Sequence, residues 1–274
     1  MTRLRAKGFS LIELVIVIVV VGVLSTMTTN IITLPVKGYI DLERRTTLVD
    51  TAEMTLRRMQ RDIRRSLSNS IRITGGTSLE LLHIADGGRY RAKLASDGSG
   101  DILDFTGTEA VSSNKSFDVL GILAAVPSGS VVIYNLDSVS TGTTSDPNAY
   151  DGDNRRTIDN TSTVNKVVLT SATPFPFTSP QQRFFIVDTP ITYSCVSGEL
   201  RRYDNTIDAG YTIGGATTSL NYKIQAKSAV LSCSFSYDPG TAARAGLVTI
   251  EITLTDDAGE STKLIYQVHV DNLP

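Results

Sequence analysis

Three hydrophobic patterns follow one another along the chain. An apolar run begins at Phe9 and continues to Leu34 with few interruptions. As a helix, the part from Leu11 to Leu34 is about 36 Å long, enough to span a bilayer with a frayed outer end. Helical periodicity follows. From Ile71 onward the pattern changes to an alternation of period two, which is typical of strands with one buried face.

The middle segment predicts a helix outside the membrane. Pro35 and Gly38 predict an interruption, in the form of a kink or bend, soon after the apolar run. Beyond them, apolar residues recur at spacings that place them on one helical face. These residues are Leu42, Val49, Ala52, Leu56, Met59, Ile63 and Leu67. We expect the helix to end near Asn69, before the turn at Gly75 and Gly76.

The remainder of the chain predicts an antiparallel, β-rich domain on which the long helix packs, so the expected fold class is α+β. Residues 248–254 (VTIEITL) alternate cleanly, with one face buried and one wet. Residues 257–260 (DAGE) then predict a hairpin turn into the last strand. The candidate strands are residues 79–85, 89–94, 102–106, 131–136, 164–170, 183–187, 191–196, 199–203, 230–237, 247–255 and 262–270.

Composition narrows the classes of function. The 274 residues are 41% hydrophobic and carry 26 Lys and Arg against 28 Asp and Glu. The formal net charge of −2 argues against a nucleic-acid binder, because nothing in the total balance favours phosphate. The length suits one large domain or two small ones, with enough residues to bury a core.

No arrangement of residues predicts catalysis. His83 lies in an apparent strand and His269 lies among alternating residues near the C-terminus, so we expect both to be structural. The sequence contains no GxSxG, HExxH or P-loop motif. We therefore expect a protein that is not an enzyme, with no catalytic residues, metal or cofactor.

Residues 139–163 predict a long loop, because they are rich in Ser, Thr, Asn, Asp and Gly and poor in apolar side chains. Within it, residues 151–154 (DGDN) invite a calcium interpretation. The EF-hand pattern also needs Gly at its sixth position and Glu at its twelfth, and both are missing here. An ordinary solvated loop is the expectation we retain.

The two cysteines, Cys195 and Cys233, allow two interpretations. The sequence has no CxxC motif and no clustering of His with Cys, which argues against a zinc site. If this part of the chain is exported to an oxidising compartment, a single disulfide is the natural interpretation. Two buried free thiols are the alternative.

The first residues set the orientation of the apolar run. Arg3, Arg5 and Lys7 precede it with no acid among them, which holds that end in the cytoplasm and sends the following chain outward. A secretory signal peptide needs a small-residue cleavage site after the run, and residues 23–29 (VLSTMTT) offer no good one. The strongest local break, Gly8, lies on the opposite side of the run.

A carboxylate, Glu13, stands near the start of the apolar run. Within a bilayer it costs about 2.5–3.5 kcal/mol, and such residues usually serve a function and have a partner. No Lys or Arg lies between Phe9 and Leu34. A cut after Gly8 would free an α-amino group on Phe9. The i, i+4 spacing would place that group and Glu13 on one helical face, so one subunit's terminus could meet its neighbour's carboxylate.

The stretch KGFSLIEL, residues 7–14, resembles the class III signal of type IV pilins and type II secretion pseudopilins. The resemblance implies that a prepilin peptidase cuts after Gly8 and methylates the new terminus at Phe9. It also implies that Glu13 aids the docking of subunits during assembly.

The same resemblance implies a domain organisation and a location. Residues 1–8 would form a leader, 9–34 a transmembrane and assembly helix, 35–70 an amphipathic extension, and 71–274 a periplasmic β-rich domain. The protein would cross the bacterial inner membrane once, with a cytoplasmic N-terminus, before it enters a pilus. Its partners would be the prepilin peptidase, other major and minor pilins, the inner-membrane assembly machinery and membrane lipid.

Later segments resemble one subgroup, the minor pilins of the mannose-sensitive haemagglutinin (MSHA) type IV pilus. The segments are residues 56–64 (LRRMQRDIR), 183–190 (RFFIVDTP), 246–249 (GLVT) and 266–274 (YQVHVDNLP). The subgroup implies a low-abundance component that helps initiate or cap assembly, with a structural disulfide between Cys195 and Cys233. A type II secretion pseudopilin remains an alternative. From another class, so does a pilus-associated adhesin whose long loop binds a sugar or a surface.

Five arginines crowd the last part of the expected helix, with Glu53 and Asp62 among them. They are Arg57, Arg58, Arg61, Arg64 and Arg65. One interpretation is a solvated face whose cations favour the helix C-terminus. The other is contact with lipid phosphates or with an acidic face of a neighbouring subunit, and a periplasmic location weakens the lipid version.

Overall fold

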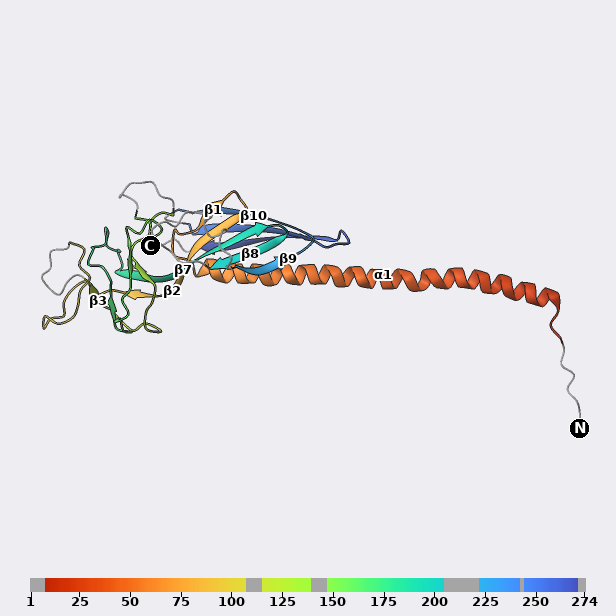
Figure 1. Ribbon diagram of the computed structural model, residues 1–274, viewed down its shortest axis with the longest axis horizontal. Coiled ribbons are helices and arrows are strands. Elements are labelled where there is room, and N and C mark those ends of the chain that lie inside the picture. Colours follow the sequence, from red (N-terminus) through yellow and green to blue (C-terminus); the bar gives the residue numbers. More distant parts are fainter. Residues whose placement is uncertain (1–7, 107–114, 139–146, 205–221, 242–243, 271–274) are drawn as a thin grey trace, which may run out of the picture.

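The structure is a computed structural model that describes residues 8–106, 115–138, 147–204, 222–241 and 244–270, without the side chains of residues 28–34. A single long helix, α1 (Leu11–Arg64), leads into a domain made of β-strands. Figure 1 shows the helix projecting from this domain, with the start of the chain at its far end. The fold is therefore α+β, with a long N-terminal helix packed on antiparallel sheets.

Helix α1 is continuous over its 54 residues, and Pro35 lies inside it. The helix therefore does not stop at Pro35 or Gly38, where the sequence predicted an interruption. A proline in a helix removes one backbone hydrogen bond and crowds the preceding turn, which favours a bend. In a helix of this length the many remaining backbone bonds carry the chain past that position.

The helix ends at Arg64, earlier than the expected end near Asn69. Beyond Arg64 the backbone leaves the helix to pair with a strand. The Leu67 N–H donates to the Leu82 carbonyl at 2.8 Å, and the Ile84 N–H donates to the Arg65 carbonyl at 2.8 Å. Leu67 is fully buried although it lies outside the helix, which is why it continued the apolar pattern in the sequence.

The strands form three sheets whose ladders are all antiparallel among the described residues. The largest has seven strands in the order β1-β2-β7-β4-β5, with β8 paired to β7 and β9 paired to β8. A second sheet has the order β10-β11-β12, and β3 pairs with β6 in the third. The bounds are β1 (Arg72–Thr74), β2 (Ser78–Arg89), β3 (Ser116–Asp118), β4 (Ser130–Val132), β5 (Arg155–Thr157), β6 (Lys166–Val168), β7 (Arg183–Val196), β8 (Glu199–Asp204), β9 (Tyr222–Lys227), β10 (Val230–Asp238), β11 (Gly246–Thr255) and β12 (Ser261–Val270).

The sequence pattern located most of these strands. The three predicted at the C-terminus correspond to β10, β11 and β12, and the prediction at 79–85 falls within β2. The predictions at 89–94 and 102–106 are wrong. Tyr90 and Leu103 are buried, so alternate residues fill the interior there without forming a regular ladder. The short strands β1, β3 and β5 and the edge strand β9 were not predicted.

Two predicted strands, 183–187 and 191–196, are one long strand, β7, which runs through Pro190. Proline lacks the N–H that a central strand needs, so it is tolerated in sheets mainly at edges and bulges. Pro190 pairs with Leu82 of β2, at a point where the register of β2 against β7 shifts. The irregular register accommodates Pro190 and lets β7 continue.

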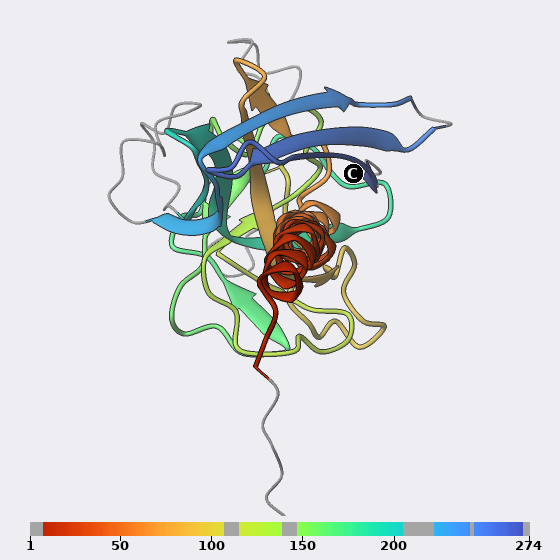
Figure 2. The same cartoon turned by 90° about the vertical axis from the view of Figure 1, so that its right-hand side faces the viewer.

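The main core lies between α1 and the sheets, and Figure 2 shows the blue strands β10–β12 passing over the helix. Leu56, Met59 and Ile63 are almost completely buried on the face of α1 that meets them. Full burial of a side chain of this size contributes about 1.5–3 kcal/mol. A second core, which contains Phe117 and Phe184, fills the part of the domain around β3, β4 and β6.

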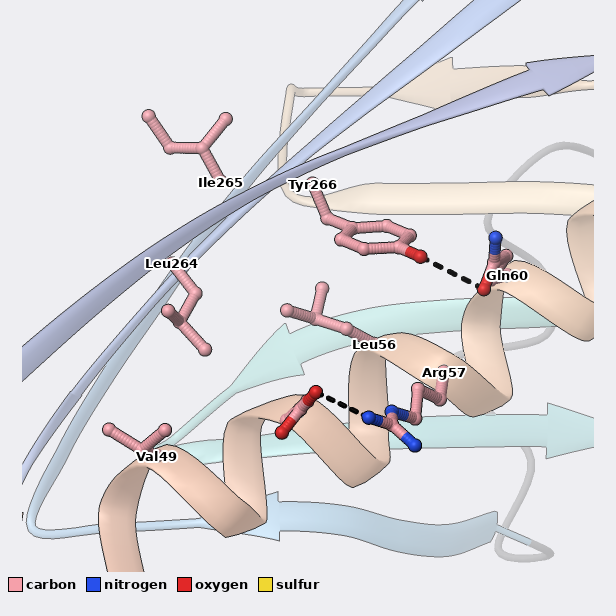
Figure 3. Close-up of a pocket in the computed structure, with 8 residues that line it drawn as sticks. Val49, Leu56, Arg57, Gln60, Leu264, Ile265 and Tyr266 are labelled. Carbon is pink, nitrogen blue, oxygen red and sulfur yellow. Dashed lines mark hydrogen bonds and ion pairs between the residues drawn. The ribbon is translucent and has the colours of Figure 1, made fainter. Parts of the chain in front are cut away.

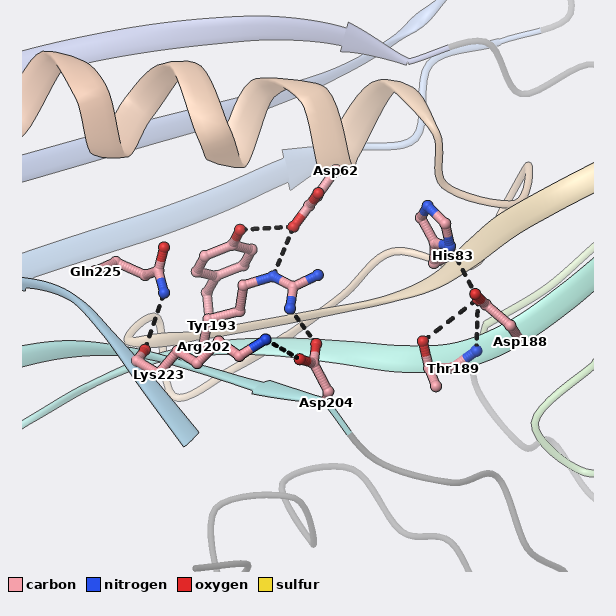
Figure 4. Close-up of polar contacts among 9 residues, drawn as sticks. All are labelled: Asp62, His83, Asp188, Thr189, Tyr193, Arg202, Asp204, Lys223 and Gln225. Carbon is pink, nitrogen blue, oxygen red and sulfur yellow. Dashed lines mark hydrogen bonds and ion pairs between the residues drawn. The ribbon is translucent and has the colours of Figure 1, made fainter. Parts of the chain in front are cut away.

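A polar cluster that we call the Asp62 clamp also holds α1 against the domain (Figure 4). One oxygen of Asp62 accepts hydrogen bonds from the Tyr193 hydroxyl at 2.7 Å and from Arg202 Nε at 2.8 Å. Arg202 also contacts Asp204. Burial, and then the negative charge of Asp62, raise the pKa of Tyr193 far above its usual range.

The Asp62 clamp yields a stability prediction. Asp62→Ala should lower the free energy of unfolding by about 2 kcal/mol, because it leaves the largely buried Tyr193 hydroxyl without its acceptor and removes one of the two carboxylates that pair with Arg202. Glu53→Ala is the matched control on the same helix, since Glu53 pairs with Arg57 in solvent and should change stability by less than about 1 kcal/mol. Urea denaturation of the detergent-solubilised protein, followed by circular dichroism, measures both. Equal effects of the two substitutions would contradict the role of the clamp.

Candidate processing and docking site

Ser10 starts helix α1. Its backbone is extended, with φ −78° and ψ 149°, and its hydroxyl accepts a hydrogen bond from the Glu13 N–H at 3.3 Å. The Ser10 carbonyl also accepts from the N–H groups of Glu13 and Leu14, at 3.1 Å and 3.3 Å. Serine is a preferred N-cap because its oxygen satisfies an amide that the first helical turn leaves unpaired.

Phe9 therefore lies outside the helix, in the segment that precedes its N-cap. In the uncut chain Phe9 is not helical and so does not share a helical face with Glu13. The expected alignment concerns the chain cut after Gly8, and it stays a prediction. Gly8 and Phe9 lie in a segment without regular secondary structure, directly before the start of α1.

The peptide bond between Gly8 and Phe9 is accessible. Gly8 is exposed, Phe9 is 78% exposed, and no atom lies within 4 Å of the position that a Cβ on Gly8 would occupy. The fold thus places no demand for glycine at this position, and any such demand comes from a protein that binds the segment. The remaining leader, residues 1–7, lies outside the described residues.

Glu13 lies in the first turn of α1, and its side chain is exposed. It forms no ion pair within the described part of the chain. The positive end of the helix dipole favours a carboxylate here by about 0.3–1 kcal/mol. This is less than the cost of about 2.5–3.5 kcal/mol that a membrane interior imposes, so a cationic partner would still stabilise Glu13 there.

The apolar residues that follow Glu13 have no cover in this chain. Leu11, Ile18 and Met27 are 82%, 62% and 59% exposed, and large apolar residues between them are similarly open on every side of the helix. A helix that is apolar all round normally lies in a core or a bilayer. Within the described residues, no helix has both the length and the apolar character needed to cross a membrane.

Ser10 is the functional residue that the sequence reasoning missed. Residues 10–13 (SLIE) fit the S-x-x-E pattern of a capping box, in which the hydroxyl and the acid both bind backbone amides at a helix start. The structure forms the serine half of this arrangement. The pattern could have been used to place the helix start between Phe9 and Leu11.

Cys195 of β7 and Cys233 of β10 form a disulfide, with their Cα atoms 6.2 Å apart. The bond joins the seven-stranded sheet to the three-stranded sheet. Cys233 is buried in the main core, and Cys195 packs against that core. The disulfide therefore fixes the two layers between which α1 lies.

The two histidines lie on different strands and have different environments. His83 Nδ1 lies 2.8 Å from Asp188 Oδ1 (Figure 4), and His269 is exposed on β12. Burial opposes ionisation of Asp188, but the contact with His83 and the Thr189 N–H outweigh it and lower the pKa of that carboxyl. The described residues contain no group of three or more His, Cys, Asp or Glu that could hold a metal ion.

The segment 147–163 is not the solvated loop that the sequence predicted. Asn148, Tyr150 and Asn154 are buried, and the Tyr150 hydroxyl donates to the Ser70 carbonyl at 3.0 Å. Asp153 accepts the backbone N–H groups of Asn148 and Asn154 at 2.9 Å and 2.8 Å, so its oxygen closes a turn. Several polar groups here bond to one another in the interior, although the buried Asn154 Oδ1 has no hydrogen-bond partner among the described residues. Burial of these polar residues explains the misleading composition. Residues 139–146 lie outside the described residues.

The alternative of an adhesin could be tested by deletion of the long loop, but the burial of this segment complicates that experiment. Deletion of residues 141–159 would remove Tyr150, whose ring packs under the guanidinium of Arg72 at 3.3 Å. Arg72 in turn pairs with Glu80 in the interior of the domain. Loss of attachment after such a deletion would therefore report a damaged fold as readily as a lost binding loop.

A groove of about 510 Å³ lies between α1 and the edge strand β12 (Figure 3). Leu56 and Leu264 line its apolar part. Its polar groups are occupied, because the Tyr266 hydroxyl donates to Gln60 Oε1 at 3.0 Å and Glu53 pairs with Arg57 at 2.6 Å. The contact of Tyr266 with Gln60 joins the sheet to the helix, and the Glu53–Arg57 pair lies within the helix, so we interpret the groove as part of the packing seam.

Comparison with known proteins assigns the N-terminal segment. Residues 3–29 match the family model described as the prokaryotic N-terminal methylation motif. The comparison with curated proteins found no match, and the comparison with solved structures found none either. The motif indicates a type IV pilin-like or pseudopilin protein, membrane-anchored, processed by a prepilin peptidase and assembled with pilus machinery.

The open surroundings of Gly8 generate a processing prediction. Gly8→Leu should leave the fold intact, since a side chain there meets no atom, but should block cleavage because its bulk obstructs the peptidase. Gly22→Leu is the matched control, because Gly22 is equally open but lies well inside α1. Electrophoresis of cell extracts should show a slower-migrating precursor for Gly8→Leu alone. Normal processing of that variant would contradict Gly8 as the cleavage residue.

Proposed function

We propose that this chain is a minor-pilin-like subunit that helps to initiate or cap a type IV pilus of the MSHA kind. Before assembly it crosses the bacterial inner membrane once, with its N-terminus in the cytoplasm and its β-rich domain in the periplasm. The observation that carries the proposal is the N-terminal motif, with its exposed Gly8–Phe9 bond and its acid at Glu13. The proposed role is structural and not catalytic.

The proposed mechanism is a transfer of Glu13 between two surroundings. In lipid the ionised carboxylate is costly, and the helix dipole offsets only part of that cost. Cleavage after Gly8 creates a cationic amine on Phe9. In a bundle of subunits that amine meets the Glu13 carboxylate of a neighbour, and an opposite charge within a few ångström favours the ionised acid.

The uncovered half of α1 supports assembly into a bundle of helices. Apolar side chains from Leu11 to Met27 are exposed, whereas the C-terminal half of the helix packs on its own domain. Exposed apolar surface of this extent normally marks an interaction with lipid or protein. Packing between parallel copies of the first half would bury it when the subunit leaves the membrane.

The proposed assignment to the MSHA system rests on the resemblance of four later segments to its minor pilin MshO. A type II secretion pseudopilin has the same N-terminal chemistry and is the second candidate, because the matched motif is common to both groups. Deletion of the gene distinguishes them. Loss of surface fibres supports a pilus, and loss of protein export with fibres retained supports a secretion pseudopilus.

Mass spectrometry of the mature N-terminus tests the proposed processing. We expect a chain that begins at Phe9 and carries one methyl group on its α-amino nitrogen. Protein recovered from cells that build working filaments should contain no residue of the leader. A chain that still begins at Met1 in such filaments would falsify the proposal.

The docking role of Glu13 gives a second prediction. Glu13→Gln should leave membrane insertion unchanged and reduce incorporation into filaments about tenfold or more, because the neutral amide cannot pair with the amine. Glu43→Gln is the matched control, since Glu43 is an exposed acid elsewhere on the same helix. Immunoblots of membranes and of sheared filaments measure the two quantities. Equal incorporation of both variants would count against docking through Glu13.

A further inference from the structure

Five arginines at the C-terminal end of α1 and at its C-cap form a continuous surface, which we call the arginine stripe. They are Arg57, Arg58, Arg61, Arg64 and Arg65, and each is exposed. Leu56, Met59 and Ile63 of the same turns are buried against the sheets. Since each residue advances a helix by about 100°, the centre of the stripe lies on the opposite face. Arg57, at the edge of the stripe, lines the groove beside β12.

The acids among these arginines do not neutralise the stripe. Asp62 is turned inward and binds Tyr193 and Arg202 in the Asp62 clamp. Glu53 pairs with Arg57 alone. Across the described residues, the side chains of the other four arginines make no ion pair. Like charges three and four residues apart destabilise a helix, so an external anion would relieve a repulsion that the fold leaves in place.

A complementary surface lies in the turn between β11 and β12, which we call the acidic turn. Its carboxylates are Asp256, Asp257 and Glu260, and none forms an ion pair within the described part of the chain. The hairpin extends along the helix towards the chain's start (Figure 1), where Asp256 and Asp257 line one small hollow together with Arg44. Arg44 itself lies 3.8 Å from Asp41.

The two surfaces cannot meet within one chain. The acidic turn is level with Arg44, and the centre of the arginine stripe is near Arg61, about 25 Å farther along the helix. This separation is more than twice the Debye length of about 8–10 Å at physiological ionic strength. Dissolved salt therefore screens the acidic turn from the arginine stripe of the same chain. Two parallel copies shifted by about 25 Å along the helix axis would, however, bring the acidic turn of one level with the stripe of the other.

We propose that the arginine stripe of one copy binds the acidic turn of a second, parallel copy shifted by about 25 Å along the axis. The contact rests on the proposed function, because assembly of a pilus brings subunits side by side in parallel with an axial shift. It joins two different surfaces at different heights, so it is a heterologous contact that fixes the axial shift between the two copies. Charge complementarity of this sort sets the register and the partner more than the raw affinity.

Charge reversal tests the contact in cells that assemble filaments. Arg58→Glu/Arg61→Glu should reduce filament-associated protein about tenfold, and Asp257→Lys/Glu260→Lys should do the same, because each places like charges together. A chain that carries all four changes should regain incorporation, since the stripe is then negative, the turn is positive, and the two surfaces attract again. Arg45→Glu/Lys93→Glu is the matched control, because both residues are exposed and lie outside the stripe.

A cross-linking experiment locates the contact. Arg61→Cys and Asp257→Cys, introduced on separately tagged copies, should form an intermolecular disulfide in membranes and filaments, and Arg45→Cys with Asp257→Cys should not. Normal incorporation of either reversed pair, absence of rescue in the fourfold variant, or equal cross-linking of both cysteine pairs would overturn the contact. Absence of rescue would point to a different acidic subunit as the occupant.

Different experimental outcomes would disprove the proposed function and the stripe contact. If the wild-type chain keeps its leader and never enters filaments, the pilus assignment is lost. Cross-linking in membranes then still decides the contact between copies. If the wild-type chain is cleaved after Gly8 and enters filaments while the reversed variants do so equally well, only the stripe contact is lost.

Discussion

One helix must satisfy two different surroundings, and this constraint organises the molecule. The C-terminal half of α1 buries Leu56, Met59 and Ile63 against two sheets, and a disulfide fixes those sheets to each other. The N-terminal half leaves its apolar side chains open. Because burial of each such side chain contributes about 1.5–3 kcal/mol, the open half carries a strong drive towards lipid or other helices. The domain buries one half of the helix and leaves the other half exposed for contact with lipid or other helices.

The direction of one side chain couples packing to surface charge. Asp62 stands among arginines in the sequence, and on an isolated helix it would pair with them. The structure turns it towards Tyr193 and Arg202, where it anchors the helix to the sheet. The surface consequently keeps its positive charge. An interaction that stabilises the subunit thereby also leaves the arginine stripe available for a partner.

Much of this architecture was predictable from residue patterns, and the failures have physical causes. Clean alternation located β10–β12 because one face of that sheet is buried and the other is wet. Pro35 predicted a break because local propensity takes no account of how many backbone bonds a long helix keeps. Tyr150 and Asn154 were assigned to solvent, because composition does not reveal polar side chains that are buried inside a domain. The N-terminal motif was recognisable, but the inward turn of Asp62 depends on residues more than a hundred positions away.

Ser10 separates the chemistry at the terminus from the conformation of the helix. The helix begins after this residue while the leader is still attached, so its first turn does not depend on removal of the leader. A peptidase acting at Gly8 meets a non-helical segment and has no helix to unwind. Precursor and mature subunit would then share one backbone geometry from Leu11 onward. The switch between a stored and an assembling subunit would be a change of charge at one nitrogen atom, with no refolding step to delay it.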